Sequence, residues 1–315
     1  MSEEGAKSTS AATAEAVPAK KLLNVLQEKL SRKEFFYSIE VTPSDATLDL
    51  TTFDHPPLFV AITWIRDNNL VAFRRSPNAC PALQMLQEVR EEFPVLSHLT
   101  CFNVTSEDLE GILRIGEPES IFALRGEIYA TPFVDCSGTS AEFKSAANLV
   151  AWLRRKLPDA TIVVAGYPAT HFLATSPDDD LRNLREKVDA GADFIITQIT
   201  FSAAQLIDFV QRCRGIGITA QILPGVFIPS SFKSLQFVTQ LGHIVLPEEL
   251  WATFKGLKDN DEAFKEKALE VGEKWMREIL AECPDEFAGF HIFTWNNLEM
   301  VTRLIQRFST SSPQT

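Results

Sequence analysis

The sequence has no long apolar run, no paired-cysteine motif and no excess of basic charge. No stretch approaches the roughly 20 apolar residues of a membrane-spanning helix, so an integral membrane protein is not expected. The five cysteines are scattered and show no CxxC spacing, which argues against a disulfide framework or a structural zinc site. With 42 acidic and 30 basic residues the net charge is −12. Neither a nucleic acid nor an anionic membrane is therefore the expected partner.

Residues 1–20 carry acidic residues and no apolar signal core, so they fit neither a secretory signal nor a transit peptide. We expect a disordered tail there, one folded unit over residues 21–309, and a flexible end at 310–315. The hydrophobic fraction of 45% is normal for a soluble protein with a sizeable core. Scattered cysteines favour a reducing compartment, and the cytoplasm is the expected location.

Short runs rich in β-branched residues alternate with amphipathic segments. The predicted strands cover residues 35–41, 58–64, 95–101, 120–126, 161–167, 193–200, 218–225 and 289–295. Strands separated by helices in this way predict an α/β fold, a single (β/α)8 TIM barrel. A doubly wound open sheet is the alternative. That fold usually has a glycine-rich turn after its first strand, and "EVTPSDATLD" (40–49) contains no glycine.

Apolar residues at helical spacing predict the helices between these strands. The predicted helical segments are 83–93, 143–157, 181–188, 206–213, 259–283 and the residues after Asn296. "TSPDDD" (175–180) indicates a helix start, with Ser176 as N-cap, Pro177 in the first turn and three acids at the positive end of the helix dipole. The first link between strands, 42–57, is short and contains proline, so a helix there is doubtful.

Active sites of such barrels lie at the C-terminal ends of the strands. One candidate there is Glu40, a carboxylate in an otherwise apolar strand that would cost several kcal/mol if buried and unpaired. The other strand ends carry Thr63–Trp64, His98–Thr100, Arg125–Glu127, Tyr167–His171, Gln198, Pro224–Phe227 and Thr294–Asn296. These residues include no cluster at metal-ligand spacing, no nucleophile elbow and no GxxxxGK[ST] loop. Metal-dependent hydrolysis and kinase chemistry are therefore disfavoured, and a large organic cofactor is favoured.

Several of these segments also carry a family resemblance. They are "SIEVTPS", "AITW", "HLTC", "ALRGE", "VAGYPATH", "LRNLREKVDAGADFIITQ", "ILPGVFIPSSF" and "HIFTWNN". In order and spacing the chain resembles the methylenetetrahydrofolate reductase family from about residue 22 to 308. The resemblance implies a (β/α)8 barrel that binds FAD and uses NADPH or NADH to reduce 5,10-methylenetetrahydrofolate to 5-methyltetrahydrofolate by a ping-pong scheme. It also implies a homo-oligomer, and a catalytic barrel without the regulatory domain of longer eukaryotic members.

Within that resemblance, Glu40 matches the glutamate of the family signature "FEFFPP" and is the expected general acid, which protonates a folate nitrogen. Desolvation by bound ligands would let this carboxyl hold a proton near neutral pH. The alternative is a structural ion pair of Glu40 with Arg125 or Lys187. Glu127 stands where the family has an aspartate that tunes the flavin, and its side chain is one methylene longer.

Cofactor contacts are implied mainly along strands three to five and the helix that follows. The expected flavin-binding residues are Thr63, Trp64, His98, Arg125, Gly126, Glu127, Tyr167, His171, Asp180, Asn183 and Lys187. Asp180, Asn183 and Lys187 are spaced i, i+3 and i+7, so they share one helix face. The alternatives are a packed aromatic for Trp64, a core histidine for His98 and a solvated helix face.

Three residues are expected to bind the folate substrate. The amide of Gln198 can donate and accept hydrogen bonds along a pterin edge. Phe232 matches an aromatic residue that stacks on folate or nicotinamide, with a core phenylalanine as the alternative. Asn297 lies where the family has an arginine.

The chain departs from the family pattern at several positions. "EVTPS" lacks the double proline of the signature, Ser145 replaces a common tyrosine, and Glu186 replaces a basic residue. Together with Glu127 and Asn297 these changes motivate an alternative, a catalytically weakened homologue that binds a flavin, a folate or a partner protein without turnover. A third hypothesis is another flavin-dependent barrel oxidoreductase.

Overall fold

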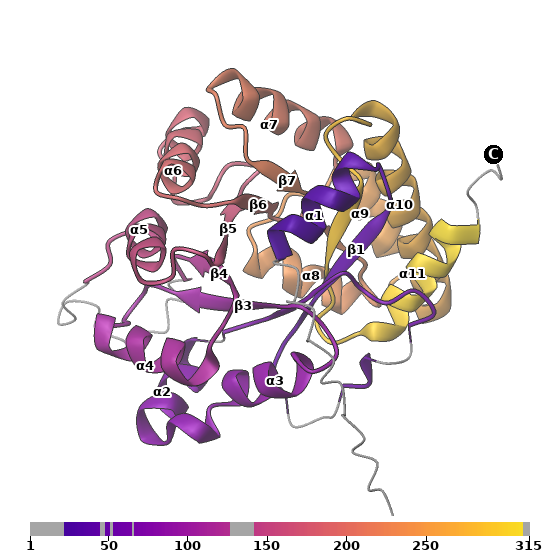
Figure 1. The fold of residues 1–315 in the computed structure, drawn as a ribbon. Coiled ribbons are helices and arrows are strands. Elements are labelled where there is room, and N and C mark those ends of the chain that lie inside the picture. Colours follow the sequence, from indigo (N-terminus) through magenta and orange to yellow (C-terminus); the bar gives the residue numbers. More distant parts are fainter. Residues whose placement is uncertain (1–21, 45–47, 51–52, 65, 127–141, 311–315) are drawn as a thin grey trace, which may run out of the picture.

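The strand-forming runs of the sequence build a parallel β-barrel surrounded by helices (Figure 1). The computed structural model describes residues 22–44, 48–50, 53–64, 66–126 and 142–310. The strands are β1 (Phe36–Val41), β2 (Val60–Ile62), β3 (Val95–Thr100), β4 (Ser120–Leu124), β5 (Thr161–Gly166), β6 (Phe194–Thr197), β7 (Gln221–Leu223), β8 (Gly225–Phe227) and β9 (Gly289–Phe293). Every predicted strand is present, and the predicted (β/α)8 fold is confirmed.

The barrel closes through a strand that is split in two. β7 pairs with β6, and β8 pairs with β9, so the segment Gln221–Phe227 joins both ends of the sheet. Pro224 interrupts the strand because it has no N–H to donate; its carbonyl accepts a hydrogen bond from His291 N at 2.9 Å. Gly225 follows, and a Cβ at this position would lie 2.2 Å from the Thr197 carbonyl oxygen. Only glycine permits this close approach.

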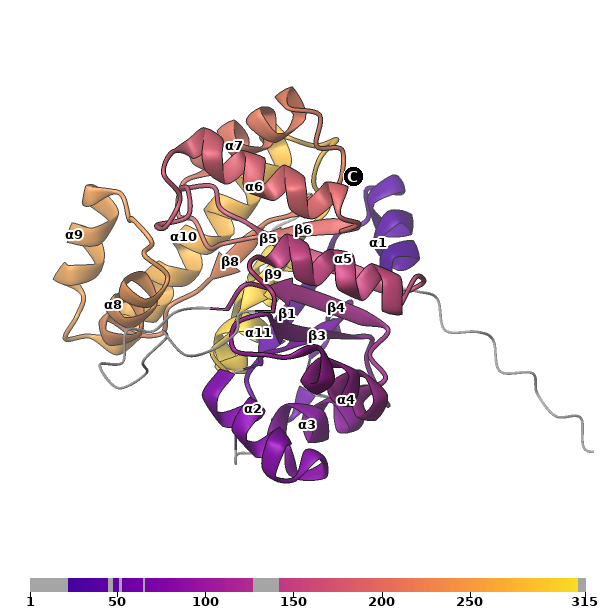
Figure 2. The same cartoon turned by 90° about the vertical axis from the view of Figure 1, so that its left-hand side faces the viewer.

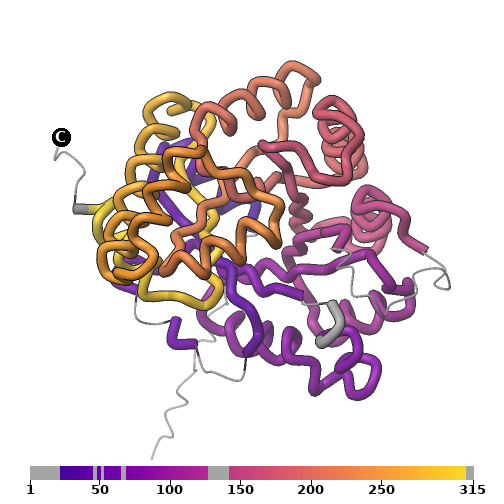
Figure 3. The backbone as a smooth tube through the Cα atoms, turned by 180° about the vertical axis from the view of Figure 1, so that it is seen from behind, coloured from indigo at the N-terminus to yellow at the C-terminus, as the bar shows by residue number. Residues whose placement is uncertain are grey.

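Helices cover the outside of the barrel. They are α1 (Leu22–Ser31), α2 (Arg66–Arg75), α3 (Pro81–Val89), α4 (Ser106–Gly116), α5 (Ala146–Lys156), α6 (Pro177–Asp189), α7 (Ala203–Gly215), α8 (Phe232–Leu241), α9 (Glu248–Gly256), α10 (Asp261–Glu282) and α11 (Leu298–Thr310), with a short 3-10 turn, η2 (Pro77–Ala79). Figure 2 shows α1 at one end of the barrel and α8 and α9 at the other. Seen from behind in Figure 3, α8 and α9 lie in front of the strands. We call this second end, where the strands finish, the mouth.

Two apolar clusters divide the core. Side chains alternate along each strand, so β1 directs Tyr37, Ile39 and Val41 toward the helices and Phe36 into the barrel. The interior cluster is completed mainly by the large side chains Phe59, Leu96, Phe122, Val163, Phe194, Ile196 and Leu223. At the base, Leu22 and Leu26 of α1 join this cluster. The interior is therefore packed, and ligand chemistry is restricted to the mouth.

The predicted helices are present, and the helix start at Ser176 is confirmed, with its Oγ accepting a hydrogen bond from Asp179 N at 3.1 Å. The structure also contains α2, α4, α8 and α9, which were not predicted. No α-helix occurs in the described residues of the link 42–57. The tail (1–20) and the last five residues lie outside the described residues. In the described part of the chain no helix combines the length and the apolar character needed to cross a bilayer.

Candidate active site

Glu40 is the last residue of β1 on the side of the strand that faces the barrel interior. Its Oε2 lies 3.6 Å from Nε2 of His98, which comes from β3, and the two side chains are only 15% and 7% exposed. Burial lowers the pKa of His98 to about 3, so its ring is neutral at pH 7. The sequence-predicted residues Glu40 and His98 are thus brought together at the mouth.

The end of β1 is held by residues after β9. Asn296 Oδ1 accepts from Thr42 N at 2.8 Å, and its Nδ2 donates to Thr42 O at 2.7 Å. Thr294 Oγ1 donates to the carbonyl of Glu40 at 2.5 Å, and Thr63 Oγ1 donates to Thr42 Oγ1 at 3.1 Å. Asn296 was among the strand-end residues of the sequence, and no role of its own was predicted for it. Its signal was the pair "NN" after a strand, since asparagine tolerates the positive φ of 60° found here.

A second group of predicted residues gathers after β5. The ring of His171 meets Tyr167 edge-on at 4.5 Å, and Asp180 Oδ2 accepts from His171 N at 3.0 Å. Lys187 Nζ donates to the Ala165 carbonyl at 2.5 Å and lies 5.6 Å from the centre of the Tyr167 ring. We call these four residues the Lys187 group. They come from the β5–α6 loop and from α6, as the resemblance implied.

Burial shifts the pKa values in the Lys187 group. Desolvation lowers the pKa of Lys187 to about 8 and raises that of Asp180 above its ordinary value. Desolvation also lowers the pKa of His171 to about 4, with smaller contributions from the nearby charges of Arg125 and Lys187. The positive charges of Arg125 and Lys187 therefore act on His171, although the whole protein carries a net charge of −12. This local concentration of positive charge suits an anionic ligand.

The end of β4 contributes Arg125 and Gly126. Arg125 is exposed. Gly126 has φ of +86°, and a Cβ there would lie 3.1 Å from Cβ of Thr100, so a side chain at this position would be strained and crowded. Glu127, predicted both as a catalytic residue and as a flavin contact, lies outside the described residues.

The remaining predicted residues have clear local contacts. Gln198, half-buried at the end of β6, accepts the Ile199 N–H at its Oε1 (2.9 Å). Phe232 begins α8 with its ring 5.2 Å from that of Trp251, and Asn297 Oδ1 accepts from Met300 N at 3.3 Å and caps α11.

Two predicted flavin contacts have other surroundings. Trp64 is buried in the outer core and lines a small cavity to which Leu83, Leu86 and His98 also contribute. Asn183 is exposed on α6. In the described residues no set of three or more His, Cys, Asp or Glu side chains is arranged to hold a metal ion.

Comparison with known proteins identifies the family. The family model for methylenetetrahydrofolate reductase matches residues 25–309. Methylenetetrahydrofolate reductase 1 of Schizosaccharomyces pombe is 30% identical over 261 residues, which cover 80% of this chain and 40% of that protein. The 5,10-methylenetetrahydrofolate reductase of Escherichia coli is 32% identical over 206 residues, 64% of this chain and 66% of that protein. The chain thus spans less than half of the fission-yeast relative.

A solved structure shares the fold. It is a Clostridium thermocellum protein that binds two copies of 5-methyl-5,6,7,8-tetrahydrofolic acid; it has a TM-score of 0.61 and 13% identity, and the match covers 90% of this chain and 98% of that one. At that identity the likeness concerns the barrel alone. The family model, in contrast, matches sequence over nearly the whole described barrel. The chain therefore belongs to the methylenetetrahydrofolate reductase family.

Proposed function

We propose that this chain is a flavin-dependent barrel that reduces 5,10-methylenetetrahydrofolate to 5-methyltetrahydrofolate with NADH or NADPH. The observation that carries the proposal is the placement of Glu40, half-buried at the mouth beside a neutral histidine. A carboxyl group in that position can hold and donate a proton near pH 7. Family membership supports this substrate, since relatives at 27 to 35% identity are named methylenetetrahydrofolate reductases.

The residues at the mouth fit FAD. The positive charges of Lys187 and Arg125 near His171 suit the diphosphate, and Gly126 has no side chain to block a ring that approaches the end of β4. Bound FAD would supply hydride transfer between the nicotinamide and the folate. Lys187 and His171 would bind the cofactor, and Arg125 with Gly126 would orient it.

Two residues of the chain would act on the folate: Glu40 would donate a proton and Gln198 would orient the pterin. Glu40 would donate the proton of its carboxyl group to a ring nitrogen of the substrate, so that the five-membered ring opens at the methylene carbon. Gln198 would orient the pterin, because its Oε1 is already fixed by Ile199 N and the amide group is thereby held in one plane. Since one mouth serves both ligands, the oxidised nicotinamide would leave before the folate binds.

Anaerobic half-reactions test this function. The purified protein is loaded with FAD, reduced with NADH or NADPH, and then mixed with 5,10-methylenetetrahydrofolate while the visible spectrum is recorded. We expect bleaching by the nicotinamide, recovery of the oxidised spectrum with folate, and formation of 5-methyltetrahydrofolate. A protein that stays colourless when offered FAD, or whose reduced spectrum persists with folate, would contradict the proposal.

A second candidate is a relative that binds flavin without efficient folate turnover. It is favoured by Asn297 and Ser145, which replace family residues and whose side chains cap α11 and α5. The polar side-chain atoms of both residues therefore serve as helix caps. The same experiment separates the two candidates, because this one predicts reduction by the nicotinamide and no reoxidation by folate.

A further inference from the structure

The barrel interior contains a line of polar groups among its aromatic side chains. Ser38 Oγ lies 2.8 Å from His291 Nδ1, and His98 Nε2 lies 3.6 Å from Glu40 Oε2. The two histidines lie within electrostatic range of each other, since His98 contributes to lowering the pKa of His291. Ser38 and His291 are 0% exposed and His98 is 6% exposed. The line therefore runs from the closed interior up to Glu40 at the mouth.

Aromatic packing fixes both rings. His98 meets Phe122 edge-on at 4.8 Å, while His291 stacks on Phe59 at 6.0 Å and meets Phe293 edge-on at 5.0 Å. Neither ring can turn without displacing side chains of a close-packed interior. The direction of each ring nitrogen is thus set by the core.

Both histidines destabilise the folded interior in a way that an apolar residue would not. Their Nε2 atoms are buried and have no hydrogen-bond partner among the described residues. Leaving such an atom unpaired destabilises the folded state. The Nε2 of His98 lies near Glu40 Oε2, only a few tenths of an ångström beyond hydrogen-bond distance. A small movement of the Glu40 side chain would satisfy the His98 nitrogen.

We propose that His98 is a positioning residue for Glu40: its neutral ring donates a hydrogen bond from Nε2–H to Oε2 of the protonated Glu40 carboxyl, so that the proton on the other carboxyl oxygen can face the substrate. This inference rests on the proposed role of Glu40 as the proton donor. A cation beside Glu40 would favour the carboxylate and remove the proton that the reaction needs. A neutral donor orients the carboxyl through one oxygen and adds no positive charge, so the other oxygen keeps its proton.

The proton balance follows from this arrangement. The O–H bond of Glu40 breaks as the N–H bond of the substrate forms, and the carboxylate is then reprotonated by a hydronium ion or buffer acid of the bulk solvent, which reaches it because Glu40 is 15% exposed. The titratable groups that meet His98 in the described interior are Glu40 on β1 and His291 on β9. Burial keeps both histidines neutral, so neither takes the proton from Glu40.

A first experiment tests the contact without using reductase activity. The whole chain, labelled with ¹⁵N-histidine, contains five histidines, and His98→Gln and His291→Gln assign the two interior rings. We expect a neutral His98 at pH 7 and a shift of its ring-nitrogen resonances in Glu40→Gln, with no shift of the exposed His243. Unchanged His98 resonances in Glu40→Gln, or a protonated His98 at pH 7, would overturn the proposal.

A second experiment separates positioning from general damage. His98→Ala should slow the folate half-reaction about tenfold or more, and more than it slows flavin reduction by the nicotinamide. His98→Gln should recover most of that loss, because its amide N–H can donate the same hydrogen bond. Equal losses in both half-reactions, or no rescue by glutamine in a protein that melts normally, contradict the positioning role. If the wild type itself fails to reduce folate, the proposed function is wrong, and the resonance shift still decides the contact.

Discussion

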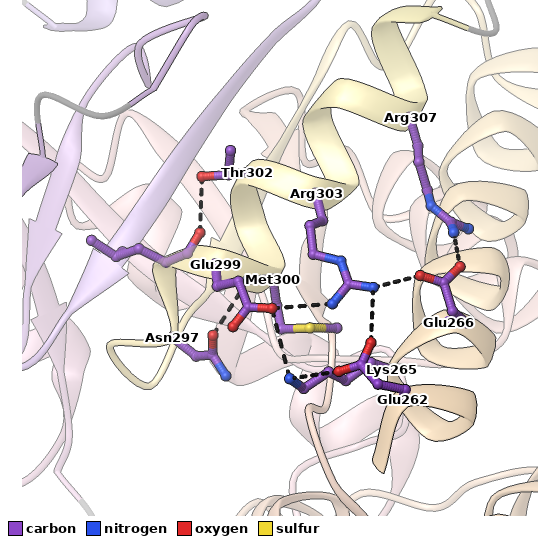
Figure 4. A network of polar contacts seen from close by, with 10 residues as sticks. Glu262, Lys265, Glu266, Asn297, Glu299, Met300, Thr302, Arg303 and Arg307 are labelled. Atoms are coloured by element: carbon purple, nitrogen blue, oxygen red, sulfur yellow. Dashed lines mark hydrogen bonds and ion pairs between the residues drawn. The ribbon is translucent and has the colours of Figure 1, made fainter. Parts of the chain in front are cut away.

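Two groups of charged side chains in this protein use the same residue types differently. Between α10 and α11, Arg303 contacts Glu299 at 3.1 Å and Glu262 at 3.7 Å and also pairs with Glu266, and Lys265 lies 3.2 Å from Glu262 (Figure 4). These carboxylates are largely exposed. The Lys187 group, in contrast, lies at the mouth, where the ammonium reaches a backbone carbonyl.

The pKa values of the lysines in the two groups shift in opposite directions. Hydrogen bonding to Glu262 raises the pKa of Lys265, whereas desolvation lowers that of Lys187 to about 8. Water screens the pairs between α10 and α11, so they contribute little beyond helix alignment. A lysine whose pKa is lowered by burial is instead typical of a site that binds a charged ligand. Exposure thus separates a structural network from a candidate binding site, although both contain a lysine and a carboxylate.

The largest expected effect is that of Glu40→Gln. Loss of the proton donor should slow the folate half-reaction about 10³-fold, while reduction of the flavin by NADH or NADPH persists. Rapid mixing with each substrate measures the two rates. Glu266→Gln, in the exposed network, is the matched control and should leave both rates unchanged. Folate reduction at the wild-type rate in Glu40→Gln would exclude this carboxyl as the acid.

The second-largest effect is expected from acidification, which should lower the free energy of unfolding. The folded-state pKa values of His98 and His291 are about 3, below the ordinary 6.5, so the unfolded chain binds more protons as the pH falls. Stability is therefore complete above pH 6.5 and is lost toward pH 3, by about 2 kcal/mol per histidine at pH 5.

Urea unfolding at pH 8 and pH 5 measures this dependence. His291→Gln should show a shallower dependence than the wild type, and exposed His243→Gln should match the wild type. If the unfolding free energy of His291→Gln depended on pH as steeply as that of the wild type, His291 would not be the cause of the pH dependence.

Replacement of Lys187 should weaken cofactor binding moderately. Lys187→Met should raise the dissociation constant for FAD about tenfold, through loss of a charge-assisted contact to phosphate, whereas Lys265→Met should leave it unchanged. Because the charged ammonium would bind the phosphate, affinity in the wild type should also fall as the pH rises through about 8. Fluorescence titration of FAD measures both effects, and equal affinities for the two variants would contradict the comparison.

The smallest effect is expected from Arg303→Ala. Exposed ion pairs contribute little, so the melting temperature should fall by less than about 3 °C. High salt should reduce the difference between variant and wild type. Calorimetry at low and high salt tests this expectation, and a large salt-independent loss would mean that the network between α10 and α11 does more than align two helices.

Much of the fold could be read from local patterns. The helix start at Ser176 was visible because N-cap chemistry depends on neighbouring residues alone. The capping box of Thr105 and Asp108 was equally visible in the sequence, yet α4 was not predicted. Trp64 and Phe232 were harder to interpret. An aromatic residue at a strand or helix end can face either a ligand or the core, and only packing against Leu83 or Trp251 distinguishes the two.

The sequence by itself determined the order of the predicted strands, the family and the identity of the residues at the strand ends, because side-chain period and motif spacing are local properties. The tertiary structure decided how the barrel closes, through the interrupted strand at Pro224, and which interior groups meet. Ser38 and His291 are 253 positions apart and still share a hydrogen bond. Such contacts depend on the stagger of strands around the barrel, and no local pattern encodes that stagger.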